Sequence, residues 1–130
     1  MGNNNSFMNK KINYDDLRNL DNNSILISTL PFDKQSVLIK NTINASEENI
    51  YVERAIKEKK NIFIYGLNAH DDKIYKKFNQ LKKLGHNNTF IYLGGLWEWI
   101  LLQEVYGKDI FETTGNCELL DFRPVSDREK

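Results

Sequence analysis

The sequence predicts an α/β fold, in which a central parallel sheet of about five strands is flanked by helices. Four short apolar runs lack polar alternation, which is typical of parallel strands that are buried on both faces. Helical patterns separate these runs, and such alternation favours helices layered on a parallel sheet. The chain has 130 residues, of which 40% are hydrophobic. This length and composition are sufficient for one domain with its own core.

The predicted strands are short, uninterrupted apolar runs. They are ILIS at 25–28, VLI at 37–39, NIFIY at 61–65 and TFIYL at 89–93. We also expect a fifth extended piece near Thr42–Ile43.

The first helical pattern, SEENIYVERAIKEK, spans residues 46–59. Ser46 is expected to cap its N-terminus, and Glu47 and Glu48 would face the positive end of the helix dipole. The residues expected on its buried side are Ile50, Val52, Ala55 and Ile56.

Two further helical patterns end at glycines. DDKIYKKFNQLKKLG reaches Gly85, which is placed to stop the helix because glycine adopts the left-handed conformation without strain. LWEWILLQEVYG ends in the same way at Gly107. The inward residues of the first pattern are expected to be Ile74, Phe78, Leu81 and Leu84. Those of the second are expected to be Leu96, Ile100, Leu101 and Val105.

Composition argues against several classes of function. Eighteen Lys and Arg balance eighteen Asp and Glu, and no basic stripe is interleaved with aromatics, so we expect no nucleic-acid partner. The single cysteine, Cys117, cannot form an intramolecular disulfide. No apolar run approaches the roughly 20 residues that span a bilayer, and MGNNNSFMNKK lacks the apolar region of a secretory signal. We therefore expect a cytoplasmic location, free, at a membrane surface or in a cytoskeletal assembly.

One stretch, IFIYGLNAHDDKIYKKF at 62–78, has the layout of a reactive loop. An apolar run leads into a short loop, and a helix follows at once. Such a loop can bind an anion at the helix N-terminus or present a nucleophile. The loop residues are Gly66, Leu67, Asn68, Ala69, His70, Asp71 and Asp72.

The order of features over residues 11–107 resembles a rhodanese-like domain. Most of the resemblance lies in NIFIYGLNAHDDKIYKKFNQLKKLGHNNTFIYLGGLWEW, with a strand, an active loop, a helix, an LKKLG turn, the next strand, and two glycines before an aromatic helix start. KINYDDLRNL resembles the segment before the first core strand, and GGLWEWILLQEVYG resembles a divergent branch found in protists and giant viruses. We therefore expect a rhodanese-like domain at 11–121. Residues 1–10 have too few apolar side chains to pack on it and are expected to be flexible, and residues 122–130 are expected to form a polar tail.

The family's activity implies a cysteine as the first loop residue, where it carries sulfur as a persulfide. That position is Gly66, which has no side chain. Ser28 and Leu30 stand where active relatives have an acidic and a basic residue, and Asp72 stands where related phosphatases need arginine. The resemblance therefore implies a catalytically inactive domain without a cofactor. It would act as a protein-binding or scaffold module for an unknown partner, through loop 66–72 and the helix beginning at Leu96.

Two alternatives stay open. The first is a sulfurtransferase or phosphatase-like enzyme that uses Cys117 or His70. The second is a structural subunit of a cytoskeletal or virion assembly, which predicts an exposed apolar patch around Trp97, Trp99 and Tyr106. The tryptophans themselves are expected to pack in a core or an interface, since they point to different sides of a helix.

His70, Asp71 and Asp72 also suggest acid–base or metal chemistry. A metal site usually needs three or four suitably spaced ligands, so the sequence predicts no metal site here. Asp71 and Asp72 are instead expected in the N-terminal turn of the helix, where each stabilises it by about 0.3–1 kcal/mol. They would replace the anion that such a loop attracts. The solvent face of this helix is expected to consist of Lys73, Lys76, Lys77, Lys82 and Lys83.

The N-terminal residues MGNNNS match the N-myristoylation pattern, with Gly2 as the acceptor and Ser6 four positions further on. One myristoyl chain binds membranes weakly, with a constant of about 10⁴ M⁻¹, so stable binding requires a second signal. Lys10 and Lys11 form only a minimal basic patch. We therefore expect weak membrane association.

Overall fold

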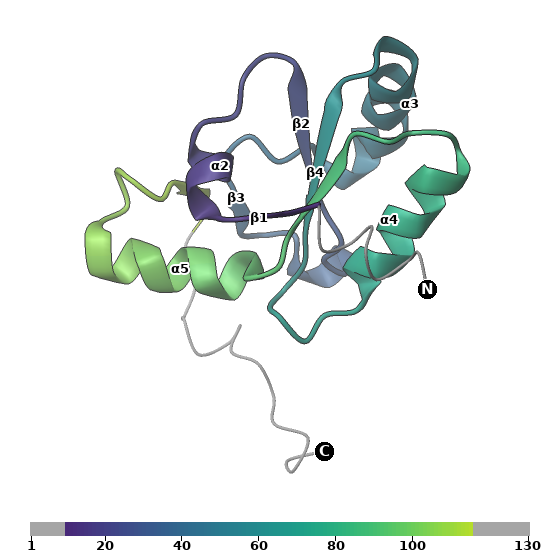
Figure 1. The fold of residues 1–130 in the computed structure, drawn as a ribbon. Helices are drawn as coiled ribbons and strands as arrows, with labels where there is room; N and C mark the ends of the chain where they lie inside the picture. The colour runs from purple at the N-terminus through teal and green to yellow at the C-terminus, as the bar shows by residue number, and fades with distance from the viewer. Residues whose placement is uncertain (1–9, 116–130) are drawn as a thin grey trace.

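The computed structural model describes residues 10–115, which form a parallel sheet with helices on both faces (Figure 1). The sheet has the strand order β1-β5-β4-β2, and all three neighbouring pairs are parallel. Its strands are β1 (Lys11–Ile12), β2 (Ser24–Ser28), β4 (Asn61–Tyr65) and β5 (Thr89–Tyr92). The prediction of an α/β fold around a parallel sheet is confirmed, with four strands in the described part of the chain.

The extended piece expected near Thr42 forms a single bridge instead of a strand. Thr42 pairs with Leu26 in parallel, and the Ile43 N–H donates to the Leu26 carbonyl at 2.8 Å. Asn41 precedes it with a left-handed φ of 73°, which interrupts the extended backbone. The outer side of β2 is therefore only partly paired.

The run at 37–39 was predicted to be a parallel strand of the main sheet, and this prediction is wrong. β3 (Leu38–Ile39) pairs antiparallel with β6 (Thr113–Thr114) in a separate two-stranded sheet. Val37 and Ile39 are buried while Leu38 is half-buried, which is the alternation of a strand with one covered face. A run of three apolar residues is too short to reveal that period.

Strand side chains alternate between two cores, one on each face of the sheet. One core packs under α3 (Glu48–Glu58) and α4 (Lys73–Lys83). The sheet contributes isoleucines to it: Ile25, Ile27, Ile62, Ile64 and Ile91. The expectation that these runs are buried on both faces is confirmed.

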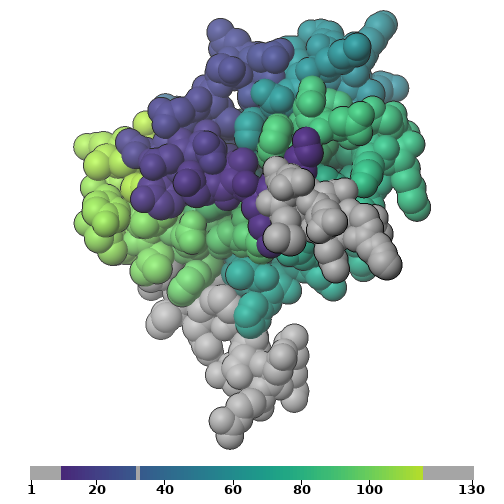
Figure 2. Space-filling model, viewed as in Figure 1, coloured from purple at the N-terminus to yellow at the C-terminus, as the bar shows by residue number. Residues whose placement is uncertain are grey.

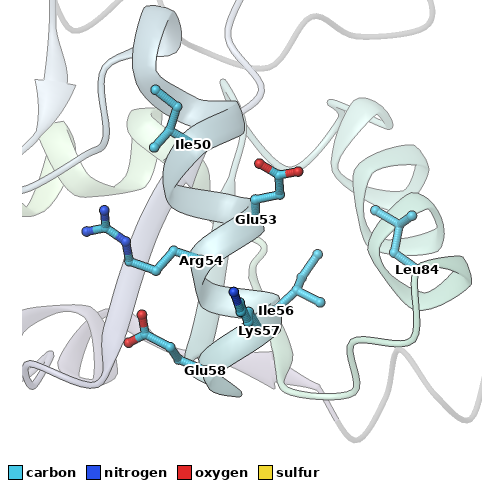
Figure 3. Close-up of a pocket in the computed structure, with 7 residues that line it drawn as sticks. All are labelled: Ile50, Glu53, Arg54, Ile56, Lys57, Glu58 and Leu84. Carbon is cyan, nitrogen blue, oxygen red and sulfur yellow. The ribbon is translucent and has the colours of Figure 1, made fainter.

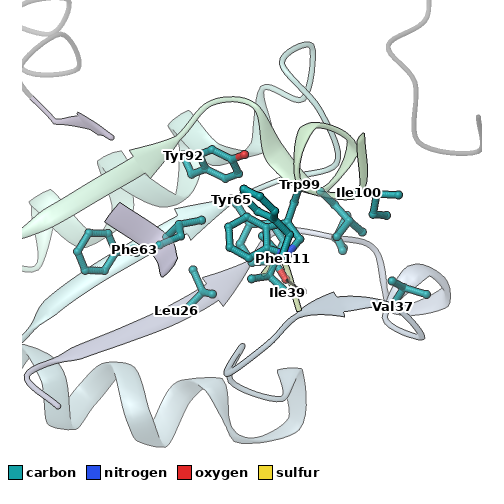
Figure 4. Packing of buried hydrophobic residues seen from close by; sticks show 12 residues of the cluster. Leu26, Val37, Ile39, Phe63, Tyr65, Tyr92, Trp99, Ile100 and Phe111 are labelled. Atoms are coloured by element: carbon teal, nitrogen blue, oxygen red, sulfur yellow. Dashed lines mark hydrogen bonds between the residues drawn. The ribbon is translucent and has the colours of Figure 1, made fainter. Parts of the chain in front are cut away.

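The other core packs under α2 (Tyr14–Arg18) and α5 (Gly95–Tyr106) (Figure 4). Figure 2 shows α2 and α5 adjoining on one side of the molecule, where the Tyr14 ring contacts Phe111 at 5.6 Å between centroids. The Tyr65 hydroxyl bonds the Ile39 N–H at 3.1 Å and the Thr42 hydroxyl at 2.8 Å. Burial raises the pKa of Tyr65 far above its ordinary value of 10. These bonds attach β3 and the Thr42 bridge to the sheet.

The start of α3 differs from the prediction. A 3-10 turn, η2 (Ala45–Glu47), precedes the helix, and the Asn44 side chain accepts from the Ser46 N–H at 3.4 Å. Asn44, and not Ser46, is therefore the capping side chain. Another short 3-10 turn, η1 (Phe32–Lys34), lies between β2 and β3.

Three residues expected inside the core are largely exposed: Ile50 at 60%, Leu84 at 59% and Val105 at 65%. Ile50 lies five residues before buried Ala55, and Val105 lies five residues after buried Ile100. Five residues turn a helix by about 140° from the buried direction, so each side chain points outward. Leu84 follows the last residue of α4 and lies outside its apolar stripe.

The ends of α4 and α5 confirm the predicted glycine stops. Gly85 has a φ of +89°, its N–H donates to the Lys82 carbonyl, and the His86 N–H donates to the Leu81 carbonyl at 3.1 Å. This pair of bonds is the Schellman motif of a helix C-terminus. Gly107 ends α5 with a φ of +112°.

Several sequence predictions lie outside the described residues. They concern Gly2 and the segment 1–9, the domain boundary at 121, Cys117, and the tail at 122–130. Within residues 10–115, no helix has the length and apolar character needed to cross a membrane.

Candidate functional site

The loop at 66–72 lies at the carboxyl edge of the parallel sheet, between β4 and α4. Ligand sites of open parallel sheets form at this edge, where loops and helix N-termini converge. The loop begins at buried Gly66, directly after Tyr65. The neighbouring strand β2 is held against it, because the Thr29 N–H donates to the Tyr65 carbonyl at 2.9 Å.

The Asp71 carboxylate turns back into this loop. One oxygen, Oδ2, accepts from the Leu67 N–H at 3.0 Å, and Oδ1 accepts from the Lys73 N–H at 3.0 Å. Amides at the start of a helix are the groups that bind an external anion in related geometries. In this chain a half-buried carboxylate of the protein itself takes that place. Asp72 is exposed and makes no capping bond with its side chain.

Gly66 is required by the space around it. A Cβ at this position would lie 2.5 Å from Asp71 Oδ2, 2.9 Å from Asp71 Cγ and 3.0 Å from Thr29 Oγ1. Such distances are well below van der Waals contact, so any side chain at 66 would displace Asp71 or Thr29. The volume where a nucleophile would begin is therefore occupied by the Asp71 carboxylate.

The N-terminus of α5 reaches the same loop from the other face. The Leu96 N–H donates to the Gly66 carbonyl and the Trp97 N–H to the Leu67 carbonyl, both at 2.9 Å. Gly95 permits this approach, since it has a φ of +68° and a Cβ there would lie 2.7 Å from the Gly66 oxygen. Two amides at the start of α5 are thus bonded to loop carbonyls.

A second carboxylate covers the start of α5. A Cβ on Gly94 would lie 2.5 Å from the Glu98 side chain, which shows that Glu98 folds back over the helix start. Glu98 Oε1 also accepts from the buried Tyr92 hydroxyl at 2.5 Å. Burial, together with the bond to Glu98 and its charge, raises the pKa of Tyr92 far above its ordinary value of 10. Tyr92 therefore acts as a neutral donor that holds Glu98 in place.

The rest of the loop divides into an inner and an outer side. Asn68 is buried, and its side-chain oxygen accepts from the His70 N–H at 2.9 Å, while its carbonyl accepts from the Asp71 N–H at 3.1 Å. Ala69, His70 and Asp72 are exposed. The loop thus exposes these three side chains to solvent on a framework of short hydrogen bonds.

The other residues that the sequence analysis named lie outside the loop at 66–72. Leu30 is buried in the core under α5, and Ser28 accepts a long bond of 3.4 Å from Gln35. Trp99 is buried, as expected, and its Nε1 donates to the Glu112 carbonyl at 3.0 Å. Trp97 is half-buried against the same core. Within residues 10–115 no group of three or more His, Cys, Asp or Glu side chains could hold a metal ion.

Two residues of the site, Glu98 and Thr29, were not identified from the sequence. The spacing of Gly94 and Glu98, four residues apart on a helix, could have indicated Glu98. Thr29 carries no signal, because its position beside Gly66 depends on the pairing of β2 with β4. The lysine prediction also needs one correction: Lys77 is half-buried and forms an ion pair with Glu48 at 2.8 Å, while Lys73, Lys76, Lys82 and Lys83 are exposed.

No protein-family model matches this chain, and no curated protein matches it.

Proposed function

We propose that this chain is a catalytically silent, rhodanese-like binding module, whose partner is a protein that docks on the outer side of loop 66–72 and the start of α5. The Asp71 carboxylate carries this proposal. It occupies the volume that a nucleophile at 66 would need and bonds the amides that would hold an incoming anion. The loop geometry of an anion site is kept, but its ligand is internal.

The rhodanese-like part of the proposal is supported by the order of elements. A buried strand, the loop, a helix, a glycine-stopped turn, a second parallel strand, and two glycines before an aromatic helix follow one another as the resemblance implies. The Thr42 bridge beside β2 is where a fifth strand would pair.

The binding part is supported by the exposed side chains of Ala69, His70 and Asp72, which sit on a loop fixed by hydrogen bonds. A loop that is already ordered loses little conformational entropy on binding, which favours its use as a recognition surface. We further propose that Gly2 carries a myristoyl group, as its sequence pattern predicts.

A sulfurtransferase assay with thiosulfate and cyanide tests the silent site. The wild-type chain is expected to show no turnover above a protein-free control, and Gly66→Cys is expected to gain none, because Asp71 fills the space. Turnover of the wild type that Cys117→Ser or His70→Ala abolishes would overturn the proposal.

Partner binding is tested by quantitative pull-down from the native cell extract. Asp72→Lys is expected to lose a protein that both the wild type and Asp109→Lys retain. Both aspartates are exposed acids, but Asp109 lies beyond the end of α5. Equal retention by all three chains would contradict the assigned surface.

The intact mass of the natively expressed protein tests the lipid. The mass of a myristoyl group should be present on the wild-type chain and absent from Gly2→Ala.

A structural subunit is a second candidate, favoured by the apolar end of α5. Val105 is 65% exposed, Tyr106 61% and Ile110 43%. Trp99 lies in the core, so this patch is displaced from the one that the sequence predicted. If the patch joins copies of the chain, sedimentation equilibrium should show an oligomer that Val105→Ser/Tyr106→Ser converts to a monomer.

A further inference from the structure

We propose that the amino edge of the sheet, opposite the loop, binds an anionic lipid bilayer directly. This edge is formed by the starts of β4 and β5 and the ends of α3 and α4. The structure gathers six lysines and one leucine around it, a set called here the amino-edge surface: Lys10, Lys57, Lys59, Lys60, Lys82, Lys83 and Leu84. The inference goes beyond the proposed function, because it concerns another surface and does not need an acylated Gly2.

The turn between α4 and β5 brings the amino-edge surface together. The Lys10 ammonium donates to the Asn87 carbonyl at 2.9 Å, and the Asn88 side chain donates to the Lys59 carbonyl at 3.4 Å. Lys82 and Lys83 form the last turn of α4, directly before Leu84. Segments far apart in the sequence therefore place their lysines around one turn.

Charge on this surface is predominantly positive. Lys57, Lys59, Lys82 and Lys83 are exposed. Glu58 lies among them, in a long ion pair of 3.6 Å with Lys60. Asp15, Asp16 and Asp21 lie at the same edge but on the α2 side, where they bond Arg18, the Asn13 N–H and the Ser24 hydroxyl. Each of the three carboxylates is therefore bonded to a partner between Asn13 and Ser24.

Leu84 distinguishes a membrane from other anionic partners. Its side chain is 59% exposed although the Schellman motif at Gly85 already closes α4 without it. It faces Ile56 across an open groove of about 1050 Å³, with Lys57 on the rim (Figure 3). The groove is lined by Glu53 and Glu58 as well as by Arg54 and Lys57, so its own charge is balanced, and the excess of positive charge beside Leu84 comes from Lys82 and Lys83. An exposed apolar side chain directly after two lysines suits the boundary between lipid headgroups and acyl chains. A single-stranded nucleic acid would favour exposed aromatic platforms over an aliphatic side chain.

The position of Lys10 supports the same surface. Residue 10 is the first that the structure describes, and its ammonium lies on the turn at Asn87. Gly2 is eight residues earlier, and an extended chain advances by about 3.5 Å per residue. A myristoyl group there would reach the bilayer beside the lysines. The amino-edge surface thus supplies the second signal that a single acyl chain requires.

Vesicle sedimentation of the unacylated full-length chain tests the proposal. The chain is expected to bind vesicles that contain phosphatidylserine in phosphatidylcholine and not to bind vesicles of pure phosphatidylcholine. The bound chain should dissociate as the ionic strength rises. Lys82→Gln/Lys83→Gln should weaken binding about 25-fold, since each lysine near an anionic surface contributes about fivefold. Leu84→Ser should weaken binding while leaving its salt dependence unchanged.

A matched control for the lysine pair lies on the same helix. Lys73→Gln/Lys76→Gln makes the same change at the other end of α4 and should bind within about twofold of the wild type. Leu84→Ile keeps an aliphatic side chain at the same place and is the control for Leu84→Ser. If the double variant at 82 and 83 is less thermally stable than the wild type, Lys83→Gln alone should still bind vesicles about fivefold more weakly. Binding to both kinds of vesicle alike, equal losses at 73/76 and 82/83, or binding to an RNA homopolymer but not to vesicles would each overturn the proposal.

Discussion

The helix termini at the two edges of the parallel sheet have different surroundings. At the carboxyl edge, N-terminal amides of α4 and α5 are bonded inside the molecule, by the Asp71 carboxylate and by the carbonyls of Gly66 and Leu67. At the amino edge, α3 and α4 end among exposed lysines and an exposed leucine. The first edge is closed to anions by its own carboxylate, whereas the second presents its charge outward. A helix terminus therefore indicates a ligand site only when the groups of the chain itself leave it open.

The largest expected effect comes from Asp71→Ala, which removes the internal ligand of the carboxyl edge. The loss of a cap and of two bonds to a charged acceptor should lower the free energy of unfolding by about 2–3 kcal/mol in urea titrations. Asp72→Ala is the matched control and should stay within about 0.5 kcal/mol of the wild type, because Asp72 is exposed and makes no capping bond. Equal losses would refute the distinction between the two residues.

The same pair of variants can show whether the closed edge is a hidden anion site. In Asp71→Ala the amides of Leu67 and Lys73 lose their acceptor, so sulfate should stabilise this variant more than it stabilises Asp72→Ala. Sulfate also stabilises proteins in general, and the Asp72→Ala titration measures that background. An identical response of both variants would show that the loop has no anion-binding geometry.

Gly66→Ala should be next in size, with a loss of about 1–3 kcal/mol in unfolding free energy, because its Cβ would collide with the Asp71 carboxylate. The cause is steric, so the loss should shrink in an Asp71→Ala background. A double-mutant cycle in urea measures this coupling, which should be about 0.5–3 kcal/mol. Additive losses would show that Gly66 is required for another reason.

Gly85→Ala tests the amino edge and should lower the free energy of unfolding by about 1 kcal/mol in urea titrations. A Cβ at 85 meets nothing within 4 Å, so the loss would come from the φ of +89° alone. Gly85→Asn should cost less in the same unfolding titration, since asparagine tolerates the left-handed conformation better. A larger loss for asparagine than for alanine would argue against this cause.

The smallest expected effect is a pH dependence that comes from His86, at the end of the Schellman motif. Burial, aided by the charge of Lys10, holds the pKa of His86 below its ordinary value of 6.5, against backbone hydrogen bonds at Asn88 and Lys60. The unfolded chain then binds the proton more readily, so stability falls as the pH drops below about 6.5.

Urea midpoints at neutral and mildly acidic pH measure this dependence. The loss of stability on acidification should be smaller in His86→Gln than in the wild type, whereas His70→Gln, on the exposed side of the carboxyl edge, should keep it. If the loss is unchanged in His86→Gln, another group is responsible.

Much of the fold was predictable because local signals sufficed. The apolar runs predicted at 25–28, 61–65 and 89–93 and the glycine stops at 85 and 107 follow from burial on both faces and from backbone conformation. The two-residue strand β1 and the five-residue helix α2 were missed, since elements so short show no period. The partner of β3 was missed as well, because it comes from the other end of the domain.

The sequence by itself placed the loop at 66–72 and showed that residue 66 has no side chain. It put Asp71 and Asp72 in the first turn of a helix, but α4 begins only at Lys73, so both aspartates precede it. Only the tertiary structure decided which aspartate enters the loop, that Thr29 and Glu98 belong to the site, and that lysines from three segments share one edge. Propensity and periodicity act between neighbours in the chain. The direction of a side chain across a loop, or beside another strand, is set by the packing of the whole sheet.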